Sequence, residues 1–440
     1  MKIKKVVLLG IPSFLLAFAL AALWDNPVTR PYFDSDYWSA IGKFGESLRL
    51  AQARYVKKES VGYDALVDSA LEGMTESLDR HSAYYPPPDY EAFQNDTKRQ
   101  YYGIGVAIRK VKAGVLVMRV FPGGPAQVAG VRRGEFIAKV EGESLEEWTL
   151  QEVTKSIKGE EGSSVLVGLR DAEGRERELE VKRGRIQMAS VEEVRVDANG
   201  TGYLRIEQFT ARTAEELRAA LKRLDAARVK RLALDLRGNA GGLLSAAVEV
   251  AGEFLPDGQI VVSAKGREGF RERVFKVKRK GEPREYPLVV LVDEGSASAS
   301  EIVAGALRVT GRAKLVGEKT YGKGSVQSVF TLEDESGLRL TTAMYYLPDG
   351  STIHERGIEP DHLVACDDEI EGKLRMQRYQ RPFEDPDAFE TLFGFAPVPD
   401  EQLRFANDLL LGKSSQESVP PRSVDADANV TLAEPPSGSP

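Results

Sequence analysis

Two short segments, residues 231–236 and 288–292, are almost wholly apolar, and a helix-forming stretch follows each of them. A strand that is apolar at successive positions has to be buried on both faces. This happens in the parallel sheets of α/β proteins, where helical crossovers cover the sheet. We therefore expect a mixed α/β (α+β) fold whose core, residues 188–371, is a sheet of the βαβ type with helices packed on it.

The chain before this core shows two patterns. Residues 36–98 should form a helical segment, because four apolar side chains recur every four residues and share one helix face: Leu66, Ala70, Met74 and Leu78. The three prolines within residues 81–88 should end that helix, since proline lacks an N–H donor and fixes φ. Residues 100–187 instead show short alternating strands between glycine turns, which predicts a compact β-rich unit.

Further local signals lie within and after the core. Residues 213–216 (TAEE) match a capping box that opens a helix. We expect a second helical segment over residues 372–411. Residues 412–440 are rich in Ser, Pro, Asp and Ala and lack periodicity, which predicts a disordered tail.

Residues 1–24 combine a basic flank with an apolar stretch. Lys2, Lys4 and Lys5 precede the uncharged residues 6–24, a pattern typical of a secretory signal peptide or an uncleaved membrane anchor. Both alternatives place the rest of the chain in the periplasm or on the outer face of the inner membrane. The chain has a single cysteine, Cys366, so it cannot form an internal disulfide. No Cys–His signature of a catalytic thiol surrounds this residue.

The overall charge excludes one class of protein. The formal net charge is −7 and the pI is about 5.5, which argues against a dedicated nucleic-acid binder. We interpret the short basic run at residues 276–280 (KVKRK) as a solvated face. No cluster of metal ligands is visible, so the sequence implies no metal and no organic cofactor.

Three glycine-rich segments follow predicted strands of the core, where open α/β sheets build their sites: residues 235–242, 295–301 and 317–325. The third matches most of a phosphate-binding loop. That loop requires Ser or Thr directly after its lysine, and it opens a helix. Here Gly324 follows Lys323, and a strand pattern comes next, so we reject nucleotide binding.

The second segment contains three serines, Ser296, Ser298 and Ser300, just before a predicted helix. A serine in this position is a helix N-cap in the simplest interpretation, and a nucleophile beside the N–H groups of a helix N-terminus in the functional one. The residues alone do not choose among the three serines.

A serine nucleophile needs a base. The chain has three histidines, at positions 81, 354 and 362, and one of them could serve. The alternative base is Lys323, between Gly322 and Gly324, because burial lowers the pKa of a lysine amine toward neutrality.

At these segments the chain resembles the carboxyl-terminal processing protease family, also called tail-specific proteases. The resemblance covers about residues 36–411. It rests on residues 78–84 (LDRHSAY), a PDZ-like unit, and three stretches in the family's order: D-L-R-x-N-x-G-G, G-S-A-S-A-S-E-I and Y-G-K-G-S-V-Q.

The resemblance implies a catalytic set. Ser298 would be the nucleophile, Lys323 the general base, and Gln327 the residue that orients the lysine amine. The N–H groups of Gly241 and Ala299 would form the oxyanion hole. The chain departs from the family pattern at Arg80 and Ala240, where the family has proline, and neither change removes a catalytic group.

The resemblance also implies a PDZ domain that binds the C-termini of protein substrates. Gly103, Ile104, Gly105 and Val106 would receive the terminal carboxylate on backbone N–H groups while the peptide adds as a β-strand. The expected function is that of an exported serine endopeptidase with a Ser–Lys pair.

Two rival hypotheses remain at this point. One is a catalytically inactive PDZ scaffold of the cell envelope, and the other is a hydrolase with a histidine base. An adaptor protein, a homo-oligomer and membrane anchoring through residues 6–24 also stay open.

Overall fold

The structure is a computed structural model, and it describes residues 34–413 except 98–99, 112–113, 172, 268–271 and 381–385. The predicted signal or anchor segment and nearly all of the predicted tail lie outside the described residues. The chain divides into two compact units, Met1–Pro87 with Val329–Leu340, and Pro88–Ser328 with Thr341–Pro440.

The first unit contains α2 (Ser35–Arg54), the 3-10 helix η2 (Lys58–Ser60), α3 (Tyr63–Glu76) and β1 (Ala83–Tyr85). The Asp34 carboxylate caps α2 by accepting the Asp36 N–H at 2.9 Å. β1 pairs antiparallel with the first residues of β18 (Gly337–Tyr346), with Ala83 opposite Arg339.

The helix α3 differs from the sequence prediction in two ways. It ends at Glu76, so Leu78 lies beyond it, and the expected apolar face is largely exposed at Met74 (46%) and Leu78 (60%). The prolines are not what ends it. They precede and open the next helix, α4 (Pro87–Thr97), because proline fits the first turn of a helix, where its missing N–H costs no hydrogen bond.

The β-rich unit is an antiparallel sheet with two short helices. The sheet order is β3-β4-β5-β7-β8, with β6 beside β5. The elements are β3 (Val106–Val111), β4 (Gly114–Val120), α5 (Pro125–Ala129), β5 (Phe136–Val140), β6 (Glu143–Ser144), α6 (Leu150–Ile157), β7 (Ser164–Arg170) and β8 (Glu176–Lys182). A separate pair, β2 (Gln100–Gly103) with β9 (Gly184–Gln187), brings the two ends of this unit together.

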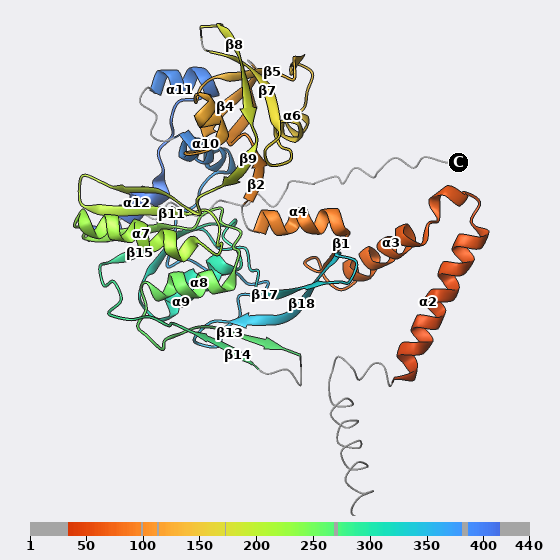
Figure 1. The fold of residues 1–440 in the computed structure, drawn as a ribbon. Helices are drawn as coiled ribbons and strands as arrows, with labels where there is room; N and C mark the ends of the chain where they lie inside the picture. The colour runs from red at the N-terminus through yellow and green to blue at the C-terminus, as the bar shows by residue number, and fades with distance from the viewer. Residues whose placement is uncertain are drawn as a thin grey trace, which may run out of the picture. The chain divides into compact units, whose positions relative to one another are not determined.

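The core sheet has six strands, of which the first, β10, is antiparallel to its neighbour and the others are parallel. In sheet order they are β10 (Val191–Val196), β11 (Thr201–Ile206), β12 (Arg231–Asp235), β15 (Leu288–Val292), β16 (Lys314–Gly317) and β19 (His362–Leu363). The crossover helices are α7 (Thr213–Ala226), α8 (Leu244–Gly252) and α9 (Ala299–Val309), so the predicted βαβ core is confirmed (Figure 1).

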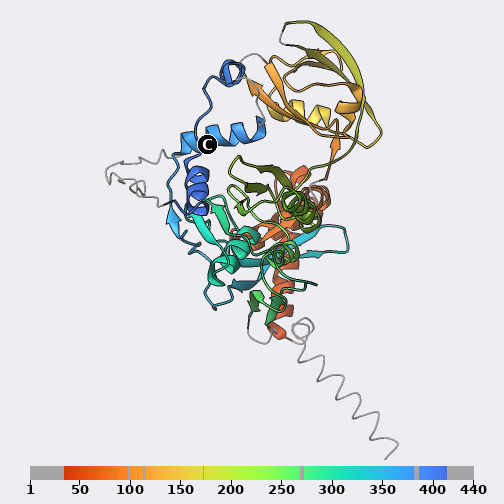
Figure 2. The ribbon, with the colours of Figure 1, turned by 90° about the vertical axis from the view of Figure 1, so that its left-hand side faces the viewer.

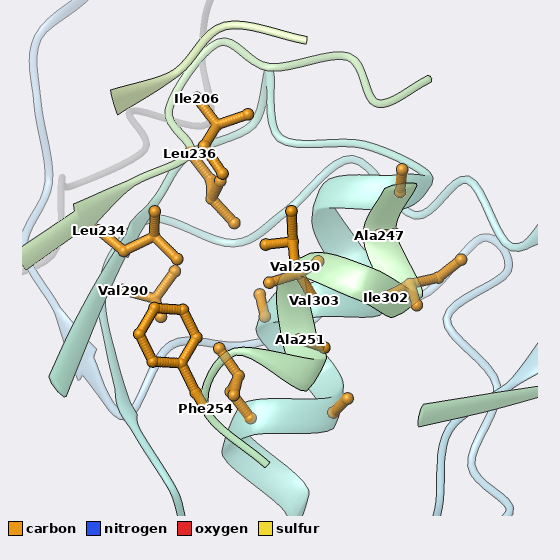
Figure 3. Packing of buried hydrophobic residues seen from close by; sticks show 14 of the residues in the cluster. Ile206, Leu234, Leu236, Ala247, Val250, Ala251, Phe254, Val290, Ile302 and Val303 are labelled. Atoms are coloured by element: carbon orange, nitrogen blue, oxygen red, sulfur yellow. The ribbon is translucent and has the colours of Figure 1, made fainter. Parts of the chain in front are cut away.

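The apolar strands are buried on both faces because side chains alternate along a strand. On one face, residues such as Leu234 and Val290 face Val250 of α8 and Val303 of α9 (Figure 3). On the other face, Leu291 and its neighbours pack against α12 (Glu401–Leu410). The helices α8 and α9 lie side by side in both ribbon views (Figures 1 and 2).

The predicted capping box at the start of α7 is wrong. Thr213 lies inside the helix, after Arg212, and its hydroxyl accepts the Thr210 N–H at 2.8 Å and donates to Ser190 Oγ at 2.8 Å. Glu216 accepts the Ser190 N–H at 2.7 Å. Thr213 and Glu216 therefore both bind Ser190, just before β10, and do not form the reciprocal hydrogen bonds of a capping box.

The remaining elements include a second sheet in the order β1-β18-β13-β14, with β17 beside β18. They are β13 (Ile260–Gly266), β14 (Arg273–Lys276), β17 (Ser325–Thr331), α10 (Asp368–Gln380) and α11 (Pro386–Phe393). Among the helices that the structure describes, none combines the length and apolarity needed to cross a membrane.

Candidate active site

The three glycine-rich segments leave neighbouring parallel strands at the same edge of the core sheet. Asp235 at the end of β12 is opposite Leu291 of β15, and Val292 of β15 is opposite Gly317 of β16. The carboxyl ends of parallel strands are where open α/β sheets carry their sites. Loops that are distant in sequence therefore meet at this edge.

The three serines of the second segment have different environments. Ser296 is fully buried, and its hydroxyl donates to the Leu236 carbonyl at 2.9 Å. Ser300 is also fully buried and donates to the Asn239 carbonyl at 2.7 Å. Ser298 is only half-buried. The outer two hydroxyls thus tie the loop to its neighbour, and the middle one is the accessible hydroxyl of the three.

The backbone at Ser298 is strained. Its φ is +56° and its ψ is −111°, a region that residues with a Cβ rarely adopt. The residue directly precedes α9, and its carbonyl accepts the Ile302 N–H at 2.9 Å. A sharp turn between a strand and a helix projects such a side chain away from the sheet and toward the helix N-terminus.

Gly241 of the first segment lies directly against this turn. A Cβ on Gly241 would come within 2.7 Å of the Ala297 carbonyl oxygen, 2.9 Å of the Ala299 nitrogen and 2.9 Å of the Ser298 Cβ. Its φ is +103°, which only glycine adopts without strain. The structure therefore brings together Gly241, Ser298 and Ala299, three residues that the resemblance placed in one site.

Asn239 holds these two loops together from inside the protein. Its side chain is fully buried, donates to the Ile206 carbonyl at 2.8 Å and accepts the Gly241 N–H at 2.9 Å. Its carbonyl accepts the Ala297 N–H at 3.0 Å. Gly241 therefore already has an acceptor, and its predicted role in an oxyanion hole requires that the N–H exchange Asn239 for the oxyanion.

Glu301 connects the serine loop to the lysine loop. The residue is fully buried. Its Oε2 accepts the N–H of Ser298 at 2.8 Å and of Lys323 at 2.9 Å. Its Oε1 accepts the Gly322 N–H at 2.8 Å and the Thr320 hydroxyl at 2.5 Å. The sequence analysis gave this glutamate no role in the site.

Lys323 lies in a closely packed loop between two glycines. The lysine is half-buried, and Gly322 and Gly324 are buried. A Cβ on Gly324 would come within 2.5 Å of the backbone nitrogen of His354, so only glycine fits there. The loop is also tied to the serine segment, because the Tyr321 N–H donates to the Ser296 carbonyl at 3.1 Å.

Gln327 lies on β17, four residues after the lysine. Its side-chain nitrogen donates to the Ser325 hydroxyl at 2.9 Å and to the Thr341 hydroxyl at 3.3 Å. These bonds fix its amide between β17 and β18. The orientation of the lysine amine by Gln327 stays a prediction.

The histidines have different positions. His362 packs its ring against Phe405, with centroids 5.4 Å apart. His81 lies in the first unit, in the turn before β1. His354 follows β18, next to Gly324, and so adjoins the lysine loop.

The single thiol is not activated. Burial, followed by the charges of Glu371 and Glu318, raises the pKa of Cys366 to about 11. A thiol with this pKa stays protonated at neutral pH, whereas a cysteine nucleophile reacts as the thiolate. In the described ranges, no three His, Cys, Asp or Glu side chains gather as they would to hold a metal ion.

A buried ion-pair network supports the first glycine-rich segment, and sequence reasoning missed it too. The fully buried Arg237 guanidinium donates to Asp235 Oδ2 at 2.7 Å and to both carboxylate oxygens of Asp400 at 2.8 Å. Burial alone would raise the pKa of Asp235, but Arg237 and Arg205 hold it well below its usual range. Arg237 thereby fixes α12 to the end of β12.

The residues predicted to bind a peptide line a groove in the β-rich unit. The groove has a volume of about 250 Å³ and runs beside residues 102–108, with Ile157 of α6 and Phe121 among the apolar residues that line it. β3 is an edge strand of its sheet. An extended peptide could therefore add beside β3 with an apolar side chain in the groove.

Comparisons with known proteins identify the family of the chain. Residues 200–364 match the model of peptidase family S41, and residues 92–169 match the PDZ domain model. A carboxy-terminal-processing protease of Bartonella bacilliformis is 32% identical over 436 residues, which are 95% of this chain and 98% of that protein. The chain belongs to the carboxy-terminal processing protease family.

Two further proteins are similar to this chain. The carboxy-terminal processing protease CtpB of Bacillus subtilis is 32% identical over 76% of this chain and 70% of its own length. The solved structure of a photosystem II D1 C-terminal processing protease is 31% identical, covers 74% of this chain and 93% of that one, and superposes with a TM-score of 0.45. Family membership makes this chain a serine-type peptidase with a PDZ domain.

Proposed function

We propose that this chain is an exported endopeptidase that binds substrate C-termini in its PDZ groove and cleaves peptide bonds with Ser298 and Lys323. The observation that carries the proposal is the difference among the three serines. Ser296 and Ser300 donate their hydroxyls to buried carbonyls, while Ser298 is half-buried, strained, and packed against Gly241 and Ala299.

The proposed reaction proceeds through an acyl-enzyme intermediate on Ser298. Lys323, as the neutral amine, removes the proton from the Ser298 hydroxyl while Oγ bonds to the scissile carbonyl carbon. The lysine then gives that proton to the leaving amine, and the C–N bond breaks. A water molecule attacks the resulting ester, with the lysine again taking and returning a proton.

The oxyanion that forms in both steps needs two N–H donors. Ala299 is the first residue of α9, where no carbonyl of the helix is in reach of its N–H. The Gly241 N–H would be the second donor. Because it binds Asn239 in the resting protein, we propose that it turns from Asn239 to the oxyanion when substrate is bound.

Export is proposed from the basic and apolar residues 1–24. It is tested by locating the protein in cell fractions and sequencing the N-terminus of the mature chain. Retention in the cytoplasm with an intact N-terminus would contradict it.

The peptidase activity is tested on an unfolded protein with an apolar C-terminus. Ser298→Ala and Lys323→Ala should each abolish cleavage, while Ser296→Ala should retain it if the variant is folded. Full activity of either Ser298→Ala or Lys323→Ala would contradict the assignment and favour a histidine base or a PDZ scaffold.

A further inference from the structure

A second, larger groove lies in the protease core, lined by residues other than those of the proposed active site and the PDZ groove. Its walls are formed by α7, by α8, and by β14 together with the chain that follows β14. Its volume is about 1100 Å³. The basic run at residues 276–280 forms part of its wall. Its three lysines are exposed, as the sequence predicted, and they line this groove.

The groove is strongly basic in a chain of net charge −7. Eight Lys and Arg side chains line it, against two glutamates, and both glutamates are paired within the groove wall. Arg218 binds Glu249 at 2.8 Å and Glu253 at 2.9 Å, and Arg284 binds Glu253 at 2.7 Å.

The other cations fall into two groups. Arg279 supports the wall, since its guanidinium donates to the carbonyls of Gly252 and Gly281. Within the part of the chain that the structure describes, five further cations of the groove have no carboxylate within 4.0 Å: Lys222, Arg273, Lys276, Lys278 and Lys280. All five are exposed. Among the described residues, these five positive charges therefore have no nearby carboxylate to neutralise them.

The groove also offers features that suit an extended polypeptide. β14 is the edge strand of its sheet, so its outer backbone groups face no neighbouring strand among the described residues. Val248 of α8 and Phe275 of β14 give the groove half-buried apolar surface between the cations. Main-chain groups, apolar contacts and cations together fit a strand whose side chains include both acidic and apolar residues.

We propose that this groove binds an acidic, extended segment of the polypeptide substrate. The proposal rests on the peptidase function proposed above. Leu244 lines the groove and opens α8 only three residues after Gly241. The nine residues of α8 span about 13 Å, which corresponds to about four residues of extended chain. A substrate with carboxylates several residues from the scissile bond could therefore bind both sites.

A concave site favours a polypeptide over a membrane surface. The flat headgroup layer of a bilayer contacts cations on a protruding or level surface. Here Phe275 and Val248 lie among the cations of a groove and are half-buried. A single extended chain can enter such a groove and reach these residues. Vesicles of an anionic phospholipid are the comparison in the test.

The test measures binding in the Ser298→Ala background, so that it does not depend on turnover. The probe is a fluorescein-labelled peptide of about ten residues with alternating Glu, Ser and Leu, long enough to fill the groove. Its C-terminus is amidated to remove the carboxylate that the PDZ groove would bind. A second peptide carries Gln in place of every Glu.

The variant Lys276→Glu/Lys278→Glu reverses two exposed charges of the groove, and Lys57→Glu/Lys58→Glu makes the same change at two exposed lysines of the first unit. At low salt we expect the groove variant to bind the acidic peptide about tenfold more weakly, because two attractions become repulsions, and the control to change it less than about twofold. Lys222→Glu on α7 should weaken binding as well, from the opposite wall.

Three results would overturn the proposal. They are equal weakening in the groove variant and the control, equally tight binding of the Gln peptide, and binding of phosphatidylglycerol vesicles that the groove variant loses while the acidic peptide does not bind. If the Ser298→Ala variant binds the peptide but the wild-type protein cleaves no substrate, the peptidase function is refuted and the groove assignment stands.

Discussion

The proposed catalytic edge and the PDZ groove are built in opposite ways. At the edge, the buried side chains of Asn239 and Glu301 accept backbone N–H groups, and the buried Arg237 guanidinium donates to the Asp235 carboxylate. In the PDZ groove, apolar side chains such as Ile157 lie beside β3, the edge strand of the described sheet. Chemistry requires fixed positions, whereas recognition requires open hydrogen-bonding groups and apolar surface. Substitutions should therefore have large effects at the first site and modest effects at the second.

The largest effect is expected at the buried ion pair. Arg237→Ala leaves Asp235 and Asp400 buried without their common partner, which should lower the free energy of unfolding by about 3–5 kcal/mol. Urea denaturation measures this loss. Arg404→Ala, which removes an exposed arginine of α12, is the control and should change little. A small effect of Arg237→Ala would show that these buried ion pairs do not stabilise this edge of the sheet.

The same network makes the stability of the fold depend on pH in the acid range. Burial raises the pKa of Asp235 and Asp400, but Arg237 lowers both, so their folded pKa values lie below their unfolded values of about 4. Their stabilisation is complete above that pH and is lost as the pH falls toward the folded values. Without Arg237 both pKa values rise, so acid unfolding of Arg237→Ala should begin at higher pH than in the wild type. Coincident acid transitions would contradict this.

Glu301→Gln should reduce kcat about a hundredfold with a smaller loss of stability. Glutamine keeps the shape, but its amide nitrogen cannot accept the N–H groups that the carboxylate now holds. Ser298 and Lys323 would lose their common anchor. Steady-state kinetics measure the change, with the exposed neighbour Glu294→Gln as the control. Unchanged kcat in Glu301→Gln would exclude a positioning role.

Gly241→Ala tests the close approach of the two loops. The new Cβ would collide with Ala297 and Ser298 at a positive φ, so we expect kcat to fall at least about tenfold and stability to fall by about 1–3 kcal/mol. Gly258 also has a positive φ, of 78°, but open space around it. Gly258→Ala should therefore lose some stability and keep its activity. Equal activity of the two variants would show that the close packing of Gly241 against Ser298 is not needed for catalysis.

The smallest effect is expected in the PDZ groove. Phe121→Ala removes part of an apolar wall and should raise KM for a substrate with an apolar C-terminus about threefold to tenfold, with kcat largely retained. Val128→Ala, at a side chain that is 83% exposed in the same unit, is the control. A fall in kcat with unchanged KM would mean that the groove acts on the chemistry and not on binding.

The sequence predicts parts of the molecule that depend on local patterns. The two apolar strands were located correctly because burial on both faces of a sheet leaves a continuous apolar signal. The helix predicted after the second glycine-rich segment is likewise present, as α9.

Contacts between distant residues were not predictable in this way. Arg237 meets Asp400, 163 residues away, and Ser300 meets the Asn239 carbonyl, 61 residues away. The pattern at 213–216 failed because Ser190 and Thr210 bind the side chains of the expected capping box. Tertiary hydrogen bonds, which leave no periodicity in the sequence, distinguish Ser298 from its neighbours.

The most direct test of the account is the reaction of Ser298 with a fluorophosphonate probe, located by mass spectrometry of the labelled peptide. We predict labelling at Ser298 in the wild type and in His354→Ala, and labelling at least about a hundredfold slower in Lys323→Ala, because the lysine supplies the base. Normal labelling of Lys323→Ala together with its loss in His354→Ala would contradict the Ser–Lys pair.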